Sequence, residues 1–348
     1  MKNIKVVICG TGAVAREATE ILIGKKGIEI VGVVGRKSYI GEDFGDVIGL
    51  NRKMGIAVSN DLDAILDQTK PDVLLDATSS LTRQVFPTLI KALDAGVNVV
   101  TACEELTNPW IAEPELAWKL DDTAKKNGVS LVTSGLNPGW YLDQIPYAFT
   151  GACATVKRIR GFRVVDGANP ADTSMTVSRN FGIGLEIEEA KKQIAEGKIT
   201  GHVGLKETIH LLADAIGWKL TKVDEKREPL PCPIDRNYKI VKIKKGQSYG
   251  IRYNGYGMVD DEEVIRFDGI WACSPTMEID GFEPGYTIWI EGKPNLKVTI
   301  DGATGVGHNT ITPARLCNWV PHIVKAKPGV LTDMTEFPLI GVLPDQQD

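Results

Sequence analysis

Three short segments of the sequence combine residue types suited to chemistry on a nucleotide and a small substrate. The first is Gly10-Thr11-Gly12-Ala13-Val14-Ala15, a G-x-G-x-x-A pattern between an expected strand, Ile4–Cys9, and an expected helix, Val14–Ile23. The first glycine allows a tight turn, the second admits a pyrophosphate, and the third small residue lets helix and strand pack closely. The pattern predicts a dinucleotide site held by the helix N-terminus; a plain strand–helix turn is the alternative. Its candidate contacts are Gly10, Thr11, Gly12, Ala13 and Val14.

The loop after the second expected strand, Ile28–Val34, carries Arg36, Lys37 and Ser38 and no acid. An NAD-selective site usually places Asp or Glu there to bond the ribose 2′-hydroxyl. Two cations and a hydroxyl suit a 2′-phosphate instead. We therefore expect NADP to be accepted, with NAD also possible; a solvated basic loop is the alternative.

Further candidates follow later strands of the same region, where ligands bind in doubly wound sheets. Thr78 and Ser79 are small hydroxyl residues that suit close passage of a coenzyme. The segment Thr101–Leu106 contains the adjacent acids Glu104 and Glu105, and Ser134–Asp143 leads out of the region. The sequence thus predicts a coenzyme and a reactive carboxylate at one edge of a sheet.

The elements that must position these residues follow from hydrophobic pattern. Short, nearly continuous apolar runs alternate with helical patterns over the first 135 residues, which indicates βαβ units and a doubly wound parallel sheet of the Rossmann type. The expected strands are Ile4–Cys9, Ile28–Val34, Val73–Ala77, Asn98–Thr101 and Ser130–Thr133, and the helices are Val14–Ile23, Leu62–Gln68, Val85–Ala95 and Pro114–Lys126.

After Asp143 the pattern changes to long strands joined by short turns, which pair antiparallel. We expect an α+β substrate and dimerisation domain with an open mixed or antiparallel sheet. Its expected strands are Val156–Val165, Tyr238–Lys245, Ser248–Val259, Glu262–Ala272, Tyr286–Glu291 and Leu296–Ile300, its helices are Leu185–Glu196 and Leu205–Ala215, and a last helix covers Asn309–Val324.

Composition narrows the function classes. The 348 residues are 43% apolar and 24% charged, with a net charge of −5, so no basic excess favours nucleic acid. No apolar run approaches the ~20 residues of a membrane span, and the chain opens directly on a strand, so we expect neither a membrane segment nor a signal peptide. Six scattered cysteines and four histidines suggest free thiols in the cytoplasm and no metal site.

Five motifs together resemble the 2,4-diaminopentanoate dehydrogenases and the related NAD(P)H-dependent amine dehydrogenases, within the dihydrodipicolinate reductase-like group. The resemblance spans nearly the whole chain. It implies a homodimer that exchanges a ketone plus ammonia for an amine with a nicotinamide hydride, and a C-terminal segment that returns to the coenzyme domain. The expected domains are therefore 1–141 with 309–348 for NAD(P), and 142–308 for substrate and dimerisation. The matching motifs are G-T-G-x-V-A, V-V-T-x-x-E-E-L, G-L-N-P-G-W-x-L-D, G-H-V-G-L-K-E-T (Gly201–Thr208) and T-x-A-R-x-x-N-x-x-P (Thr312–Pro321).

For such a reaction, a carboxylate near the substrate nitrogen steadies an ammonium or iminium and accepts a proton from attacking water. The family motif assigns this role to Glu104, and Glu105 is expected to bond backbone or orient the loop. A solvated loop is the alternative for the pair.

Several other residues are candidates for contact with substrate or coenzyme, each with a structural alternative. Asn137 suits nicotinamide or substrate but is also a turn device before proline, and Trp140 suits an apolar wall or the core. Arginine suits a substrate carboxylate, although exposed arginine is the ordinary case. The candidates are Asn137 and Asn318 for coenzyme, and Asn137, Trp140, Arg163, Arg179 and His202 for substrate.

Two other functions remain open from the sequence. A dihydrodipicolinate reductase-like imine reductase would carry paired histidines and a Lys followed by a Ser-Gly-Thr loop, and no such segment follows Asp143. A non-catalytic NADP sensor would keep the glycine turn without needing Glu104. The sequence does not decide between a diamino acid and a simple amine as substrate.

Overall fold

The computed structural model describes residues 3–167, 181–238, 241–300 and 306–346. The chain forms two compact units, Met1–Trp140 with Thr310–Asp348, and Tyr141–Asn309, which we call the first and the second unit. The first unit is therefore built from both ends of the chain.

The first unit contains a seven-stranded sheet in the order β15-β6-β5-β4-β1-β2-β3, and every pair of neighbouring strands is parallel. Chain order reverses between β1 and β4, which is where ligands bind in doubly wound sheets. This confirms the predicted Rossmann-type α/β fold. The strands are β1 Ile4–Cys9, β2 Ile28–Val34, β3 Val58–Ser59, β4 Val73–Asp76, β5 Asn98–Thr101, β6 Ser130–Thr133 and β15 Gly329–Leu331.

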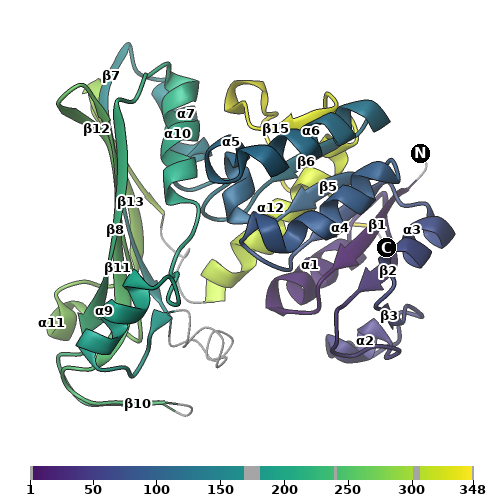
Figure 1. The fold of residues 1–348 in the computed structure, drawn as a ribbon, viewed down its shortest axis with the longest axis horizontal. Coiled ribbons are helices and arrows are strands. Elements are labelled where there is room, and N and C mark those ends of the chain that lie inside the picture. The colour runs from purple at the N-terminus through teal and green to yellow at the C-terminus, as the bar shows by residue number, and fades with distance from the viewer. Residues whose placement is uncertain (1–2, 168–180, 239–240, 301–305, 347–348) are drawn as a thin grey trace. The chain divides into compact units, whose positions relative to one another are not determined.

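Helices cover both faces of this sheet (Figure 1). Residues of β1 alternate between two apolar clusters, with Val6 and Ile8 in one and Val7 and Cys9 in the other. The first cluster includes residues of α1 and α12, and the second includes residues of α3, α4 and α6. Because both faces are buried, the strands are apolar throughout. The helices are α1 Ala13–Ile23, α2 Phe44–Val47, α3 Leu62–Thr69, α4 Thr82–Asp94, α5 Pro109–Ala112, α6 Pro114–Asn127 and α12 Val306–Ile323.

The short elements of the first unit were not predicted. Strands β3 and β15 have two and three residues, too few for a periodic pattern. Strand β15 pairs with β6 and so extends the sheet with the C-terminal part of the chain. Helix α4 begins at Thr82, three residues before the predicted start at Val85, because the carboxylate that caps it comes from a distant segment.

The second unit contains a six-stranded sheet in the order β14-β13-β7-β12-β11-β8, in which only β7 and β12 run parallel among the pairs described. The prediction of an open mixed or antiparallel sheet is confirmed, and the sheet is mixed. Helix α10 packs on β11, where a Cβ added at Gly255 would lie 2.7 Å from Leu205. The elements are α7 Gln144–Thr150, β7 Thr155–Asp166, α9 Ile187–Ala195, α10 Leu205–Ile216, β8 Lys222–Pro231, β11 Ser248–Val259, β12 Glu262–Ala272, α11 Met277–Asp280, β13 Gly285–Lys293 and β14 Leu296–Ile300.

One prediction for this sheet was wrong, and one of its strands was not predicted. Tyr238–Lys245 is not one strand: β9 Arg236–Asn237 and β10 Lys242–Ile243 form a separate two-stranded pair, and residues 239–240 lie outside the described part. The charged, proline-containing segment Lys222–Pro231 is not among the expected strands but forms β8, an edge strand that pairs with β11. An edge strand tolerates proline because half of its backbone groups need no partner strand.

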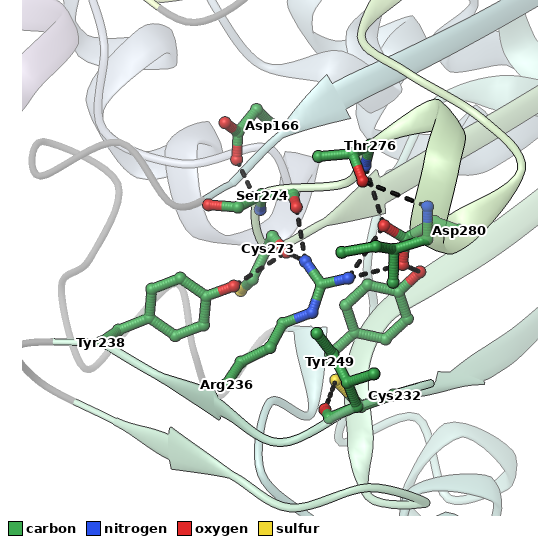
Figure 2. A network of polar contacts seen from close by, with 11 residues as sticks. Asp166, Cys232, Arg236, Tyr238, Tyr249, Cys273, Ser274, Thr276 and Asp280 are labelled. Carbon is green, nitrogen blue, oxygen red and sulfur yellow. Dashed lines mark hydrogen bonds and ion pairs between the residues drawn. The ribbon is translucent and has the colours of Figure 1, made fainter.

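A buried ion pair holds one region of the second unit together (Figure 2). Arg236 donates to both carboxylate oxygens of Asp280, at 2.7 and 2.8 Å, with side-chain exposures of 8% and 0%. Arg236 also donates to the Cys273 carbonyl at 2.8 Å, and the Tyr249 hydroxyl donates to Asp280 at 2.8 Å. These contacts satisfy the charge of Arg236 within the protein.

Candidate coenzyme and active site

The two glycines of the turn between β1 and α1 have different structural roles. Gly10 has φ +118, and a Cβ there would lie 2.9 Å from the Ala77 carbonyl oxygen, so this position requires glycine. Gly12 has φ −80 and an added Cβ would meet nothing within 4 Å. The absent side chain of Gly12 therefore leaves open space at the start of α1, which has no side-chain cap. Uncapped N–H groups beside open space suit a phosphate.

A cavity of about 1010 Å³ extends from this turn. It brings together eight of the ten coenzyme residues predicted from the glycine turn and its neighbouring loops. Ala13 and Val14, the other two, begin α1 and are not among its lining residues. The predicted residues that line the cavity are Gly10, Thr11, Gly12, Arg36, Lys37, Ser38, Thr78 and Ser79.

Some charged side chains of the cavity wall have partners within the protein, and others have no recorded ion pair among the described residues. Lys91 pairs with Asp63 at 2.6 Å, and Asp61 accepts from the Ala64 amide at 3.0 Å as the cap of α3. Arg36 and Lys37 are exposed, and no ion pair in the described part of the chain includes either. The loop after β2 thus offers positive charge to a ligand. Asn60–Asp63 and residues of α4 also line the cavity and were not predicted, because Asn60–Asp63 follows the unpredicted strand β3.

A buried carboxylate, Asp76, lies at the carboxyl end of β4 and was also missed. It is 0% exposed and accepts from the Thr78 hydroxyl at 2.6 Å and the Thr101 hydroxyl at 2.7 Å. Burial raises the pKa of Asp76 to about 6, although hydrogen bonds from both threonines oppose the shift. No periodic signal marks such a residue in the sequence.

Glu104 and Glu105 begin a 3₁₀ helix, Glu104–Thr107, and both are half-buried. Glu105 accepts from the Thr82 amide at 2.6 Å and so caps α4. This contact is the loop-orienting role expected of Glu105. Glu105 thus has a structural role in the first unit, and the reactive role of Glu104 stays a prediction from the family motif.

The loop that carries Asn137 is held by the C-terminal helix of the same unit. The Leu136 amide donates to the Thr312 hydroxyl at 3.1 Å, and Arg315 donates to the Gly139 carbonyl at 3.5 Å. Two residues of the C-terminal motif thus support this loop. Within the loop, Asn137 is buried at 6% exposure and Trp140, the last residue of this part of the unit, is half-buried.

Asn318, on the same helix, makes a structural contact. Its side-chain oxygen accepts from the Leu343 amide at 3.0 Å, which fixes the C-terminal segment. It is not among the lining residues of the coenzyme cavity.

In the second unit, Tyr253 joins two of the predicted substrate residues. Arg163 on β7 is 7% exposed, donates from Nε to the Tyr253 hydroxyl and lies over its ring, 5.5 Å from the centroid. The ring of His202, 6% exposed, lies 5.2 Å from the Tyr253 ring. Gly269 makes room for this ring, since a Cβ there would lie 2.0 Å from it. Arg179 lies outside the described residues.

Tyr141, adjacent to Trp140 in the sequence, belongs to the core of the second unit. It is fully buried, and its hydroxyl contacts the Phe162 and Thr287 carbonyls at 2.8 and 2.9 Å. Among the described residues, no cluster of three or more His, Cys, Asp or Glu is placed to hold a metal. No described helix has the length and apolar character that crossing a membrane requires.

Comparison with known proteins now decides the family. Residues 140–347 match the family model described as the 2,4-diaminopentanoate dehydrogenase C-terminal domain. The chain is 35% identical over 341 residues to the 2,4-diaminopentanoate dehydrogenase of Acetoanaerobium sticklandii, covering 97% of this chain and 94% of that relative. The chain belongs to the 2,4-diaminopentanoate dehydrogenase family. The resemblance stated from the motifs is therefore confirmed, and the protein is an amine dehydrogenase, an oxidoreductase that uses a nicotinamide coenzyme.

The chain is also similar to two amine dehydrogenases and, over its first unit, to a second family model. The amine dehydrogenase of Streptomyces virginiae is 26% identical over 353 residues, covering 97% of this chain and 96% of that relative. The solved structure of an amine dehydrogenase from Mycobacterium smegmatis has a TM-score of 0.83 and 24% identity over 95% of both chains, which establishes the fold. The family model described as dihydrodipicolinate reductase, N-terminus, matches residues 4–113, all within the first unit.

Proposed function

We propose that this amine dehydrogenase converts a small primary amine, of the 2,4-diaminopentanoate kind, to a ketone and ammonia, and catalyses the reverse reductive amination. The observation that carries the proposal is the cavity against the glycine turn, which is lined by eight of the residues predicted to bind the coenzyme. Hydride leaves the amine carbon, an iminium forms, and water converts it to the ketone and ammonium. The bound coenzyme supplies the hydride acceptor.

The residues of the first unit fit that coenzyme. The α1 amides and the open space at Gly12 suit the pyrophosphate, and Thr78 and Ser79 line its path. Arg36, Lys37 and Ser38 suit a 2′-phosphate, so we propose that NADP is accepted, with NAD as a second coenzyme. Coenzyme binding is therefore the proposed role of the first unit.

Glu104 is proposed to hold the substrate nitrogen and to accept a proton from the water that attacks the iminium. Asn137 and Trp140 are proposed to contact coenzyme or substrate from the loop held by α12. Arg163 and His202, gathered around Tyr253, are proposed to serve a substrate carboxylate if the substrate is a diamino acid. The second unit is then the substrate unit.

A reductive-amination assay tests this function. Purified protein is given ammonia and NADPH or NADH with 2-amino-4-oxopentanoate and with small linear and cyclic ketones, and coenzyme oxidation is followed by absorbance. Glu104→Gln is expected to lower kcat by about 10²–10⁴-fold while coenzyme still binds.

Glu105→Gln and Glu115→Gln are the matched controls for this experiment. Glu105→Gln should weaken the cap of α4 and lower stability, with turnover retained in the folded fraction. Glu115 is exposed, and Glu115→Gln should change neither property. Near-normal turnover of folded Glu104→Gln would show that another group moves the proton.

We also propose a cytoplasmic homodimer, as the family resemblance implies. Mass photometry of the purified protein at nanomolar concentration measures the mass directly. A single species at the 37.8 kDa of one chain would contradict the dimer.

A further inference from the structure

Asp76 is the last residue of β4 and has no cation to balance its charge. Its side chain is 0% exposed, and no ion pair recorded for the described residues includes it. Its hydrogen-bond donors are all neutral: the hydroxyls of Thr78 and Thr101, the Thr78 amide and the Cys9 thiol. A buried carboxylate without a counter-ion is costly, so a structural role alone gives little reason for an acid at this position.

The two hydroxyls belong to two different loops at the carboxyl edge of the sheet. Thr78 lies two residues beyond Asp76 and lines the coenzyme cavity. Thr101 is the last residue of β5, directly paired with Asp76 in the parallel ladder. The Thr101 hydroxyl oxygen accepts from the Cys103 amide at 3.1 Å, and Cys103 immediately precedes Glu104. One carboxylate therefore connects the coenzyme loop with the loop that carries the proposed catalytic acid.

We propose that Asp76 is a positioning residue for the reaction, which holds the Thr78 loop and the Cys103–Glu104 loop in one arrangement through its two hydroxyl donors. The proposal rests on the proposed function for the part that concerns Glu104. The part that concerns Thr78 needs only coenzyme binding.

The arrangement requires the ionised acid. A carboxylate only accepts, so both threonine hydroxyls point their protons at Asp76, and Thr101 keeps a lone pair for the Cys103 amide. A protonated Asp76 carries its own O–H donor, so the threonine hydroxyl on that side must turn its proton away and accept instead of donating. The amide of asparagine has the same effect on one side at every pH.

The neighbouring titratable groups do not carry a charge that shifts the pKa of Asp76, so burial is the main cause of its raised pKa. Cys9 on β1 and Cys103 after β5 are buried thiols whose own pKa is raised by burial and by the charge of Asp76, so both stay neutral. The charge of Arg36 opposes these effects and acts to lower the pKa of Cys9. With the pKa of Asp76 raised by burial to about 6, the full arrangement holds above about pH 6 and is lost below it.

Three variants separate the two connections. Thr78→Val removes the connection to the coenzyme loop, Thr101→Val removes the connection to Glu104, and Asp76→Asn alters both. Thr19→Val is the matched control, because Thr19 is fully buried in the same unit and its hydroxyl donates to the Ala15 carbonyl at 2.8 Å within α1.

The readouts are the Kd of NADPH by fluorescence, kcat and KM from pH 5 to 8, and amide hydrogen exchange of the Cys103–Leu106 peptide. Thr78→Val should raise the NADPH Kd about tenfold, and Thr101→Val should lower kcat about tenfold and speed exchange. Thr19→Val should leave all within about twofold. Asp76→Asn should show both changes and lose the dependence near pH 6. Because the 2′-phosphate of NADPH also titrates near pH 6, the diagnostic quantity is the ratio of variant to parent at each pH.

The outcomes are distinguishable. If no amine or ketone is turned over, the proposed function fails, while NADPH binding and hydrogen exchange still test Asp76. If folded Asp76→Asn keeps the parent's Kd, exchange rate and pH dependence, the positioning role is overturned. If Asp76→Asn does not fold, the threonine variants decide, and equal effects of both on Kd alone would overturn the assignment of two loops.

Discussion

Asp280 and Asp76 are aspartates with buried side chains, and an arginine lies against Asp280 but no ion pair of the described residues includes Asp76. Asp280 in the second unit accepts two hydrogen bonds from Arg236, one from the Tyr249 hydroxyl and one from the Thr276 amide. Asp76 in the first unit accepts from neutral hydroxyls. Burial pushes the pKa of both upward, yet the pKa of Asp280 is lowered because these donors outweigh burial, and that of Asp76 is raised to about 6.

This difference indicates that Asp280 stabilises the fold, whereas Asp76 serves a ligand site. A carboxylate paired with arginine stays ionised over the physiological range and fixes its neighbours permanently. A carboxylate held by neutral donors alone changes its hydrogen-bonding pattern when it binds a proton. The first lies far in sequence from any predicted site residue, and the second lies beside the coenzyme cavity.

The largest expected effect comes from breaking the paired charge. Asp280→Asn leaves Arg236 buried without its counter-ion and should lower the free energy of unfolding by about 3–5 kcal/mol at pH 7. The loss should shrink as pH falls, because a lowered pKa contributes stability only while the carboxyl is ionised. Urea denaturation at pH 7, pH 4 and pH 2 measures this loss, which should shrink mainly between pH 4 and pH 2 because the reference pKa is 3.8. A loss below about 1 kcal/mol at pH 7 would contradict the claim that Asp280, unlike Asp76, stabilises the fold through its ion pair.

Asp76→Asn should change stability with the opposite pH trend. The folded pKa of about 6 lies above the reference of 3.8, so the folded parent holds the proton more tightly and loses stability as pH rises between these values. Full ionisation costs about 3 kcal/mol, a cost that asparagine avoids. The variant should therefore gain about 3 kcal/mol on the parent between pH 4 and pH 7, measured by the same denaturation series. A constant difference across pH would refute the raised pKa.

At the cavity edge, removing an uncompensated surface charge should affect ligand and not fold. Arg36→Ala should raise the Kd of NADPH about tenfold and leave that of NADH within about twofold, because only NADPH carries the 2′-phosphate. The melting temperature should stay unchanged. Lys26→Ala, an exposed cation outside the cavity lining, is the control. Equal effects on the two coenzymes would remove the basis for proposing NADP.

The smallest effect is expected at Tyr249. Tyr249→Phe removes one donor from Asp280 and keeps Arg236 in place, so the free energy of unfolding should fall by about 1 kcal/mol. Coenzyme Kd should not change, since Tyr249 lies in the second unit. Calorimetry and NADPH fluorescence measure the two quantities. A weaker coenzyme affinity in this variant would show that the two regions are coupled.

Local patterns predicted most of the first unit. The five strands of four or more residues (β1, β2, β4, β5 and β6) and the helices α1, α3, α4 and α6 were predicted, because apolar spacing is a property of contiguous residues. Strand β8 was missed because its proline and charges are acceptable only at a sheet edge, and the chain alone does not say which strand is at the edge. The start of α4 was displaced because its cap, Glu105, is 23 residues away in the sequence.

The candidate site divides in the same way. The glycine turn and the Arg36–Ser38 loop were found from adjacent residues, and the structure gathers eight of those predicted residues around one cavity. Tyr253, which contacts Arg163 from 90 residues away, carried no signal in the sequence. Asn318 was predicted to contact coenzyme, and its bond to Leu343 is visible only once the C-terminal segment is folded back.

The sequence by itself determined the α/β class, a second sheet of mixed or antiparallel type, the family and the residue types available for a nucleotide and an amine. These follow from periodicity and from motifs whose members are neighbours in the chain. The tertiary structure alone decided which of two adjacent glutamates caps a helix, and that Asp76 is buried beneath two loops without a cation. The reason is physical: hydrogen-bond partners and burial are set by residues brought together from distant parts of the chain, and it is they that fix a carboxylate's charge.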